Sequence, residues 1–97
     1  MDAVLNQGIV TDGLLGAVEI RFPVQHDIKG LTIEFGKAYP VDFNIESDNG
    51  TVEITGNTAG HFVTEEIFTG ATFLRIVPVK MVNGQSRLRV HKITMGI

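Results

Sequence analysis

The stretch VDFNIESDNGTVEIT, residues 41–55, decides the fold class of this chain. Apolar and polar side chains alternate on both sides of Asn49-Gly50, which is the period of a strand with one buried face. The apolar positions are Phe43, Ile45, Val52 and Ile54. An Asn-Gly pair between two alternating runs is a strong hairpin signal, because both residues tolerate the backbone of a tight turn. Residues 41–55 therefore predict an antiparallel hairpin.

The same two-residue period extends outward from this hairpin in both directions. Further strands are predicted at 18–22, 31–35, 61–66, 72–79, 87–90 and 93–95, separated by turn residues. Pro23 is expected to end the first of these strands, and 61–66 is expected to be a short or edge strand. About seven short strands with turns every 8–12 residues predict an all-β fold, an antiparallel β-sandwich. We expect one domain over residues 1–97, with 1–16 as a loop or irregular segment containing at most a short strand.

The alternation also predicts which side chains form the core. Pro78 should lie at a sheet edge, because it cannot donate to a strand ladder. A bulge near His91-Lys92 would bring Val90, Ile93 and Met95 to one face. The expected core is Val18, Ile20, Phe22, Ile28, Leu31, Ile33, Phe35, Phe43, Ile45, Val52, Ile54, Leu74, Ile76, Leu88, Val90 and Ile93.

Composition excludes several classes of protein. Hydrophobic residues make up 43% of the chain and charged residues 20%, which favours a folded domain over a disordered one. A formal net charge of −3 predicts no nucleic-acid partner. The chain has no cysteine, so disulfides are excluded. No apolar run approaches the roughly 20 residues that cross a bilayer, so we expect no membrane insertion.

Catalytic and metal-binding patterns are weak. The histidines His26, His61 and His91 fall on different predicted strands without ligand spacing, so we predict no metal site and no cofactor. Glu65-Glu66 is the one adjacent carboxylate pair, and neighbouring strand residues point to opposite faces. Such a pair cannot flank one glycosidic bond. No serine lies in a GxSxG elbow. We predict that the chain is not an enzyme.

The strongest polar cluster contains Arg75, Arg87 and Arg89, with Lys92 nearby. In a structural interpretation, these side chains pair with carboxylates such as Glu46 on neighbouring strands. In a functional interpretation, guanidinium groups clamp a carboxylated or hydroxylated ligand through their planar fork. Both interpretations stay open at this point.

The order of motifs resembles the discoidin-like, galactose-binding jelly-roll superfamily from residue 18 to the C-terminus. The motifs that carry this resemblance are VEIRF (18–22), QHDIKGLTIEFG (25–36), YPVDFNIE (39–46), ATFLRI (71–76) and RLRVHKITMG (87–96). The segment VKMVNGQSRLR (79–89) is similar to an element of modules in phage and prophage structural proteins of gut bacteria. The first third is shortened or divergent here, and TDG (11–13) alone resembles the family's first ligand loop.

The resemblance implies a jelly-roll sandwich and two functions of different class. The first is a non-catalytic structural or adhesion module within a larger phage-derived or cell-surface protein, with other protein chains as partners. Its location would be a virion or an extracellular surface. The alternative is a carbohydrate-binding module that recognises a glycan through its end loops. No calcium site is implied, because Lys92 or Thr94 stands where some relatives place a glutamate. The oligomeric state is left open.

Any ligand is expected at the loops of one end of the sandwich, since strand faces are committed to the core or to solvent. The longest connections are 7–16, 56–61 and 79–86. Polar contacts are expected from charged residues near these loops, with aromatic residues as apolar support. The candidate residues are Asp12, Arg75, Arg87 and Arg89 for polar contacts, and Tyr39 and Phe62 for apolar support.

Overall fold

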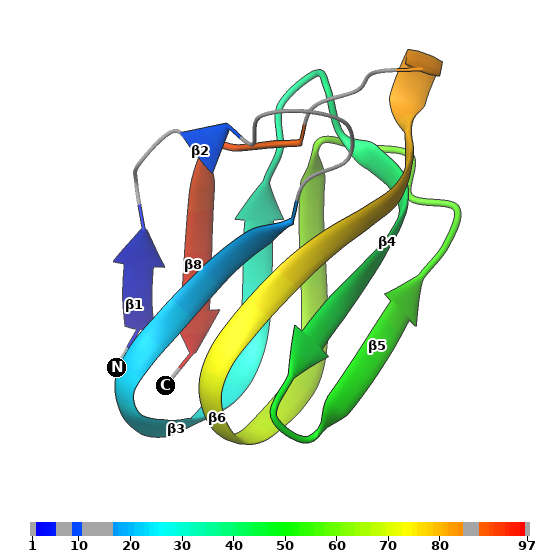
Figure 1. Ribbon diagram of the computed structural model, residues 1–97. Coiled ribbons are helices and arrows are strands. Elements are labelled where there is room, and N and C mark those ends of the chain that lie inside the picture. Colours follow the sequence, from blue (N-terminus) through cyan, green and yellow to red (C-terminus); the bar gives the residue numbers. More distant parts are fainter. Residues whose placement is uncertain (1, 6–8, 11–16, 85–87, 97) are drawn as a thin grey trace.

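The computed structural model describes residues 2–5, 9–10, 17–84 and 88–96. Eight strands and one short 3-10 turn make up the described secondary structure (Figure 1). In chain order these are β1 Asp2–Leu5, β2 Ile9–Val10, β3 Val18–Glu34, β4 Pro40–Ser47, β5 Gly50–Ile54, β6 His61–Met81, the turn Val82–Gly84, β7 Arg89–Val90 and β8 Lys92–Gly96. The expected all-β class is confirmed. No described helix is long and apolar enough to cross a membrane.

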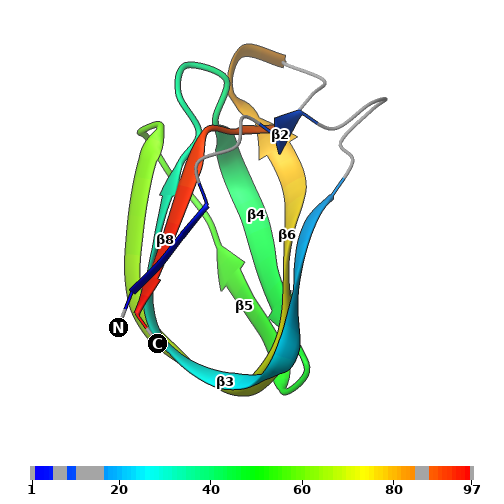
Figure 2. The same cartoon turned by 90° about the vertical axis from the view of Figure 1, so that its left-hand side faces the viewer.

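One antiparallel sheet contains six of these strands in the order β1-β8-β3-β6-β4-β5, and β2 pairs separately with β7. Figure 2 shows how the six strands form a sandwich: β3 and β6 both curve through the lower end of the molecule. Val18–Arg21 pair with Phe73–Ile76 in one layer, which β4 and β5 extend. Ile28–Glu34 pair with His61–Phe68 in the facing layer, which β8 and β1 extend. The antiparallel β-sandwich is therefore a single sheet folded over on itself.

The continuity of β3 and β6 corrects two expectations from sequence. Pro23 does not end its strand, because the β3–β6 register is interrupted between Arg21 and His26 and the missing N–H falls in that gap. Residues 61–66 and 72–79 belong to one 21-residue strand. Gly70 bends that strand at φ 61°, a conformation that side-chain-bearing residues rarely adopt. The N–H of Gly70 donates to Oδ1 of Asp27 at 2.9 Å, so the bends of β3 and β6 are joined.

Other local expectations have clear outcomes. The predicted hairpin is confirmed, but Ser47 and Gly50 are cross-strand partners, so its turn is Asp48-Asn49 and not Asn49-Gly50. Pro78 lies beyond Ile76, the last β6 residue that pairs with β3, and therefore at a described sheet edge on that side. His91 separates β7 from β8, where the chain passes from the small sheet to the large one. Within 1–16, which was expected to be irregular, β1 and β2 are strands, and 1, 6–8 and 11–16 lie outside the described residues.

The core lies between the two layers and follows the predicted alternation. Ile20, Phe22, Val52 and Ile54 are half-buried and pack against it, since β5 is an edge strand and Phe22 lies near the bend. Six described residues outside the expected core are also buried: Pro40, Phe68, Ala71, Pro78, Met81 and Met95. The predicted residues that are buried are Val18, Ile28, Leu31, Ile33, Phe35, Phe43, Ile45, Leu74, Ile76, Leu88, Val90 and Ile93.

The turn between β4 and β5 is tied to the bend of β6 by Asp48. Its Oδ1 accepts the backbone N–H groups of Thr72 at 2.8 Å and Phe73 at 3.3 Å, and its Oδ2 accepts the Thr72 hydroxyl at 2.5 Å. The hydrogen bond from the Thr72 side chain, followed by that from its backbone, holds the pKa of Asp48 below its usual range. Because these bonds favour the ionised carboxylate, they stabilise the folded state only while Asp48 is charged.

Replacing Asp48 with asparagine should therefore destabilise the protein in a pH-dependent way. An unfolded aspartate has a pKa of about 3.9, and the folded value is lower, so the contribution is fully present above about pH 4–5. It is lost as the pH falls through the folded pKa. Urea unfolding midpoints from pH 6 down to pH 2 should show a gap between the native protein and Asp48→Asn that closes only in strong acid. Glu65→Gln, on an exposed strand position, is the control, and a gap that stays constant to pH 2 would contradict the assignment.

Candidate functional site

A pocket opens between the β4–β5 hairpin and the bend of β6, and we call it the hairpin–bend pocket. Its volume is about 500 Å³. The hairpin and the bend lie at the lower end of the sandwich in Figure 1, opposite the connection 55–60. The lining residues are Ser47, Asn49, Gly50, Thr51, Val52, Ile67, Phe68 and Thr69. Volumes of 300–1,000 Å³ are usual for small-ligand sites, so the pocket has room for a sugar residue.

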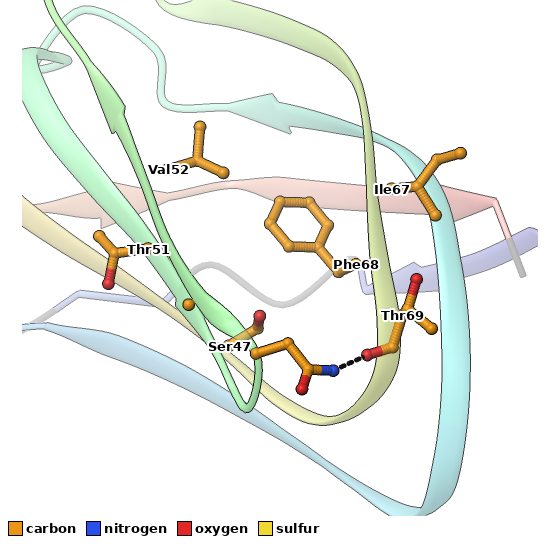
Figure 3. A pocket seen from close by; sticks show the side chains of 8 residues that line it. Ser47, Thr51, Val52, Ile67, Phe68 and Thr69 are labelled. Carbon is orange, nitrogen blue, oxygen red and sulfur yellow. Dashed lines mark hydrogen bonds between the residues drawn. The ribbon is translucent and has the colours of Figure 1, made fainter.

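Strand alternation determines which side chains face inward at this pocket. Ser47 is two positions beyond Ile45, so it lies on the face of β4 that is turned toward the core. Val52 is half-buried against the core cluster, and Phe68 is buried, with 4% of its surface exposed. Figure 3 shows the Phe68 ring extending from β6 toward β5, whereas Ile67 points the other way. One hydroxyl and two apolar side chains therefore meet at the inner end of the pocket.

The rim of the pocket carries neutral polar groups. Nδ2 of Asn49 donates to the carbonyl oxygen of Thr69, drawn as the dashed line in Figure 3, and this bond connects the hairpin to β6. Oδ1 of the same amide is an acceptor suited to a hydroxyl. Thr51 and Thr69 also line the pocket and are exposed, but Figure 3 shows their side chains turned away from Val52 and Phe68. The pocket thus combines an apolar inner wall with the hydroxyl of Ser47 and the amide of Asn49.

Arg75 lies elsewhere, on the outer face of the layer formed by β3, β6, β4 and β5. Its Nη2 is 2.6 Å from Oε1 of Glu19 on β3, and its Nη1 is 3.0 Å from Oε1 of Glu46 on β4. Glu19 also accepts Nε of Arg21 at 2.9 Å. The hydrogen bond from Arg75, with smaller contributions from Arg21, lowers the pKa of Glu19. The structural interpretation of Arg75, cross-strand pairing with Glu46, describes this arrangement.

The two aromatic candidates do not join Arg75 in one surface. Phe62 points into the sandwich, and its ring packs edge-to-face on Phe43 with centroids 5.0 Å apart. Tyr39 is half-buried against the core, and its carbonyl accepts the N–H of Val82 at 3.0 Å. The aromatic ring that does accompany Arg75 is that of Phe73, at 5.1 Å from the guanidinium carbon. Phe62 and Tyr39 therefore pack against the core, and their part in binding stays a prediction.

The remaining candidates are only partly described. Asp12 and Arg87 lie outside the described residues, and Arg89 is described through its backbone, which pairs with Val10 in the small sheet. Nothing in the described part of the chain tests their role, so their participation in binding stays a prediction. The residues of the hairpin–bend pocket were not anticipated, because the pocket exists only once β6 folds beside the hairpin.

The three histidines lie in separate surroundings. His26 packs edge-to-face on Phe22 with centroids 5.8 Å apart, and Nδ1 of His61 is 3.4 Å from Oε1 of Glu34. His91 follows β7, and its N–H donates to the carbonyl of Glu34 at 2.8 Å. Among residues 17–84 and 88–96, no three histidine or carboxylate side chains come close enough together to hold a metal ion.

Comparison with known proteins gives one informative likeness. Neither a protein-family model nor a curated protein sequence matches the chain. Among solved structures, the chain is similar to chitosan-binding module 1 of a chitosanase/glucanase from Paenibacillus sp. IK-5, with a TM-score of 0.71 and 12% sequence identity. The likeness covers 87% of this chain and 72% of that one. At this identity the comparison establishes the shared all-β sandwich fold.

Proposed function

We propose that this chain is a non-catalytic carbohydrate-binding module, and that the hairpin–bend pocket is its sugar site. From the sequence, a structural or adhesion module was the first predicted function and carbohydrate binding the alternative. The likeness in fold to a chitosan-binding module supports the second of these. The link to discoidin-like domains and to phage structural proteins rests on the sequence motifs alone and is not needed for the proposal.

The lining of the hairpin–bend pocket is the observation that carries this proposal. A pyranose presents hydroxyl groups around its edge and C–H groups on its faces, so it needs paired donors and acceptors beside an apolar wall. Ser47 and Asn49 supply the polar groups, while Val52 and Phe68 supply the wall. Apolar lining with a few convergent polar groups is the usual composition of a small-ligand site. The outer face around Arg75 is a weaker candidate, because its guanidinium is already paired with two carboxylates.

The proposal is tested by screening the purified chain on a glycan array and measuring the strongest hits by calorimetry. Ser47→Ala removes the inward hydroxyl, and loss of one hydrogen bond worth about 1 kcal/mol should weaken binding about fivefold. Ser47→Phe places a bulky ring in the pocket beside Val52 and Phe68 and should abolish binding. Thr58→Ala, at an exposed position in the connection 55–60, is the control and should bind like the native protein.

Unfolding curves of all three variants separate lost binding from lost structure. An array without a hit would refute carbohydrate binding. A hit whose affinity is the same in Ser47→Phe, with that variant folded, would show that the sugar binds outside the hairpin–bend pocket.

A further inference from the structure

The hairpin–bend pocket has a property that bears on which sugars it accepts. None of the eight residues that line it within the described chain is charged. Its side-chain polar groups include the hydroxyl of Ser47 and the amide of Asn49. These groups can match the hydroxyls of a sugar, but none of them can neutralise an ammonium or a carboxylate.

Asp48 is the carboxylate that lies between two lining residues in the sequence, whereas Glu46, Glu53 and Glu66 are each next to one. Both of its oxygens are engaged on the side of the β6 bend, with the N–H groups of Thr72 and Phe73 and with the Thr72 hydroxyl. Turning this carboxylate toward the pocket would break the contacts that hold the turn on the bend. The Asp48 carboxylate therefore holds the β4–β5 turn on the β6 bend and is not a partner for a cationic ligand.

Other charges surround the pocket without belonging to it. Glu65 and Glu66 line a separate shallow hollow with Thr64 and Ile67, and both side chains are exposed. Lys29 is the cross-strand partner of Ile67 and is also exposed. Charges of both signs thus lie in solvent near the rim, where screening weakens their effect on a bound group.

We infer that the hairpin–bend pocket, if it is the sugar site proposed above, selects uncharged sugar residues and disfavours those with a free amine or a carboxylate. A charged group that enters a pocket without a partner loses hydration and gains no ion pair in return. A neutral hydroxyl or acetamide loses less, because Ser47 and Asn49 can replace its water contacts. An acetamide also offers a methyl group to the apolar wall of Val52 and Phe68.

This selectivity would be opposite to the one in the name of the structural neighbour. Chitosan is a polymer of amino sugars whose amines are protonated in mildly acidic solution. The present pocket fits the N-acetylated form of the same backbone better than the free-amine form. Because the two forms have the same length and linkage, they make a matched pair of ligands.

The experiment compares chitotetraose with its fully N-acetylated form by calorimetry at pH 5.5, with cellotetraose as a neutral reference and tetragalacturonic acid as an acidic probe. We expect the N-acetylated or the neutral tetrasaccharide to bind about tenfold tighter than either charged one. Ser47→Asp places a carboxylate at the inner wall and should raise the affinity for chitotetraose relative to its acetylated form. Thr58→Asp adds the same charge away from the pocket and should leave that ratio unchanged.

Each outcome separates this inference from the proposed function. Chitotetraose or tetragalacturonic acid binding as tightly as the neutral sugars, with the binding lost in Ser47→Phe, would overturn the selectivity and keep the sugar site. If none of the four tetrasaccharides binds, the glycans that bind on the array are tested with Ser47→Phe. Glycans that lose binding in this variant support the inference if they are uncharged and overturn it if they are all charged. No hit at all would refute the proposed function itself.

Discussion

Replacing Phe43 with alanine should lower the free energy of unfolding by about 3–5 kcal/mol, the usual cost of removing a buried phenylalanine. Phe43 is fully buried, and its ring packs edge-to-face on Phe35 at 5.5 Å and on Phe62 at 5.0 Å. Phe62 comes from the facing layer, so the ring joins the two halves of the folded sheet. The substitution would leave a cavity at this junction, which β4 cannot close without moving the hairpin.

Urea unfolding followed by circular dichroism measures this effect. Val63→Ala is the matched control, since Val63 is 58% exposed and should change stability by less than about 0.5 kcal/mol. If Phe43→Ala does not fold, Phe43→Leu gives a smaller loss that can still be quantified. A loss below about 1 kcal/mol in Phe43→Ala would mean that the ring does not join the layers.

Gly60→Ala should destabilise the protein by about 1–3 kcal/mol, because the backbone leaves no room for a side chain at this position. A Cβ on residue 60 would lie 2.0 Å from the carbonyl oxygen of Gly36. That contact is with backbone, so it cannot be relieved by rotating a side chain. The carbonyl of Gly60 also accepts the N–H of Phe35 at 2.6 Å, which holds the β5–β6 connection against the end of β3.

The comparison for this prediction is Thr58→Ala, two residues earlier in the same exposed connection, which should be near neutral. Thermal unfolding of the two variants side by side measures the difference. Equal melting temperatures would show that the connection moves away from Gly36 at little cost.

Local patterns in the sequence were sufficient for the strands but not for their continuity. The 41–55 hairpin and most of the core follow from two-residue alternation, which depends only on neighbouring positions. Pro23 and Gly70 would ordinarily end a strand. Here they fall where the β3–β6 register is irregular, so the sheet bends at these places and continues. That register depends on residues far apart in the chain, which periodicity cannot relate.

The contacts at the candidate site also depend on residues far apart in the chain, which local sequence patterns do not relate. Pairing of Arg75 with Glu46 was one of two open interpretations, because residues 46 and 75 were both expected on solvent-facing strand positions. Glu19 was not anticipated as a second partner, since its position opposite Arg75 depends on the β3–β6 register. Ser47 was part of the predicted hairpin and was not a candidate for binding. Its place in a pocket depends on Phe68, which is brought beside it by the bend.

The two strands that run through both layers also determine how the molecule opens. β3 pairs with β6 from Val18 and Ile76 at one end to Glu34 and His61 at the other, so each layer shares two of its strands with the other. If the strands of one layer separate, the same two strands are also displaced in the other layer, because their backbone is continuous. Subglobal unfolding units arise where one part of a protein can detach from the rest. Because β3 and β6 run through both layers, we expect amide protons deep in the two layers to exchange with solvent by the same global unfolding event.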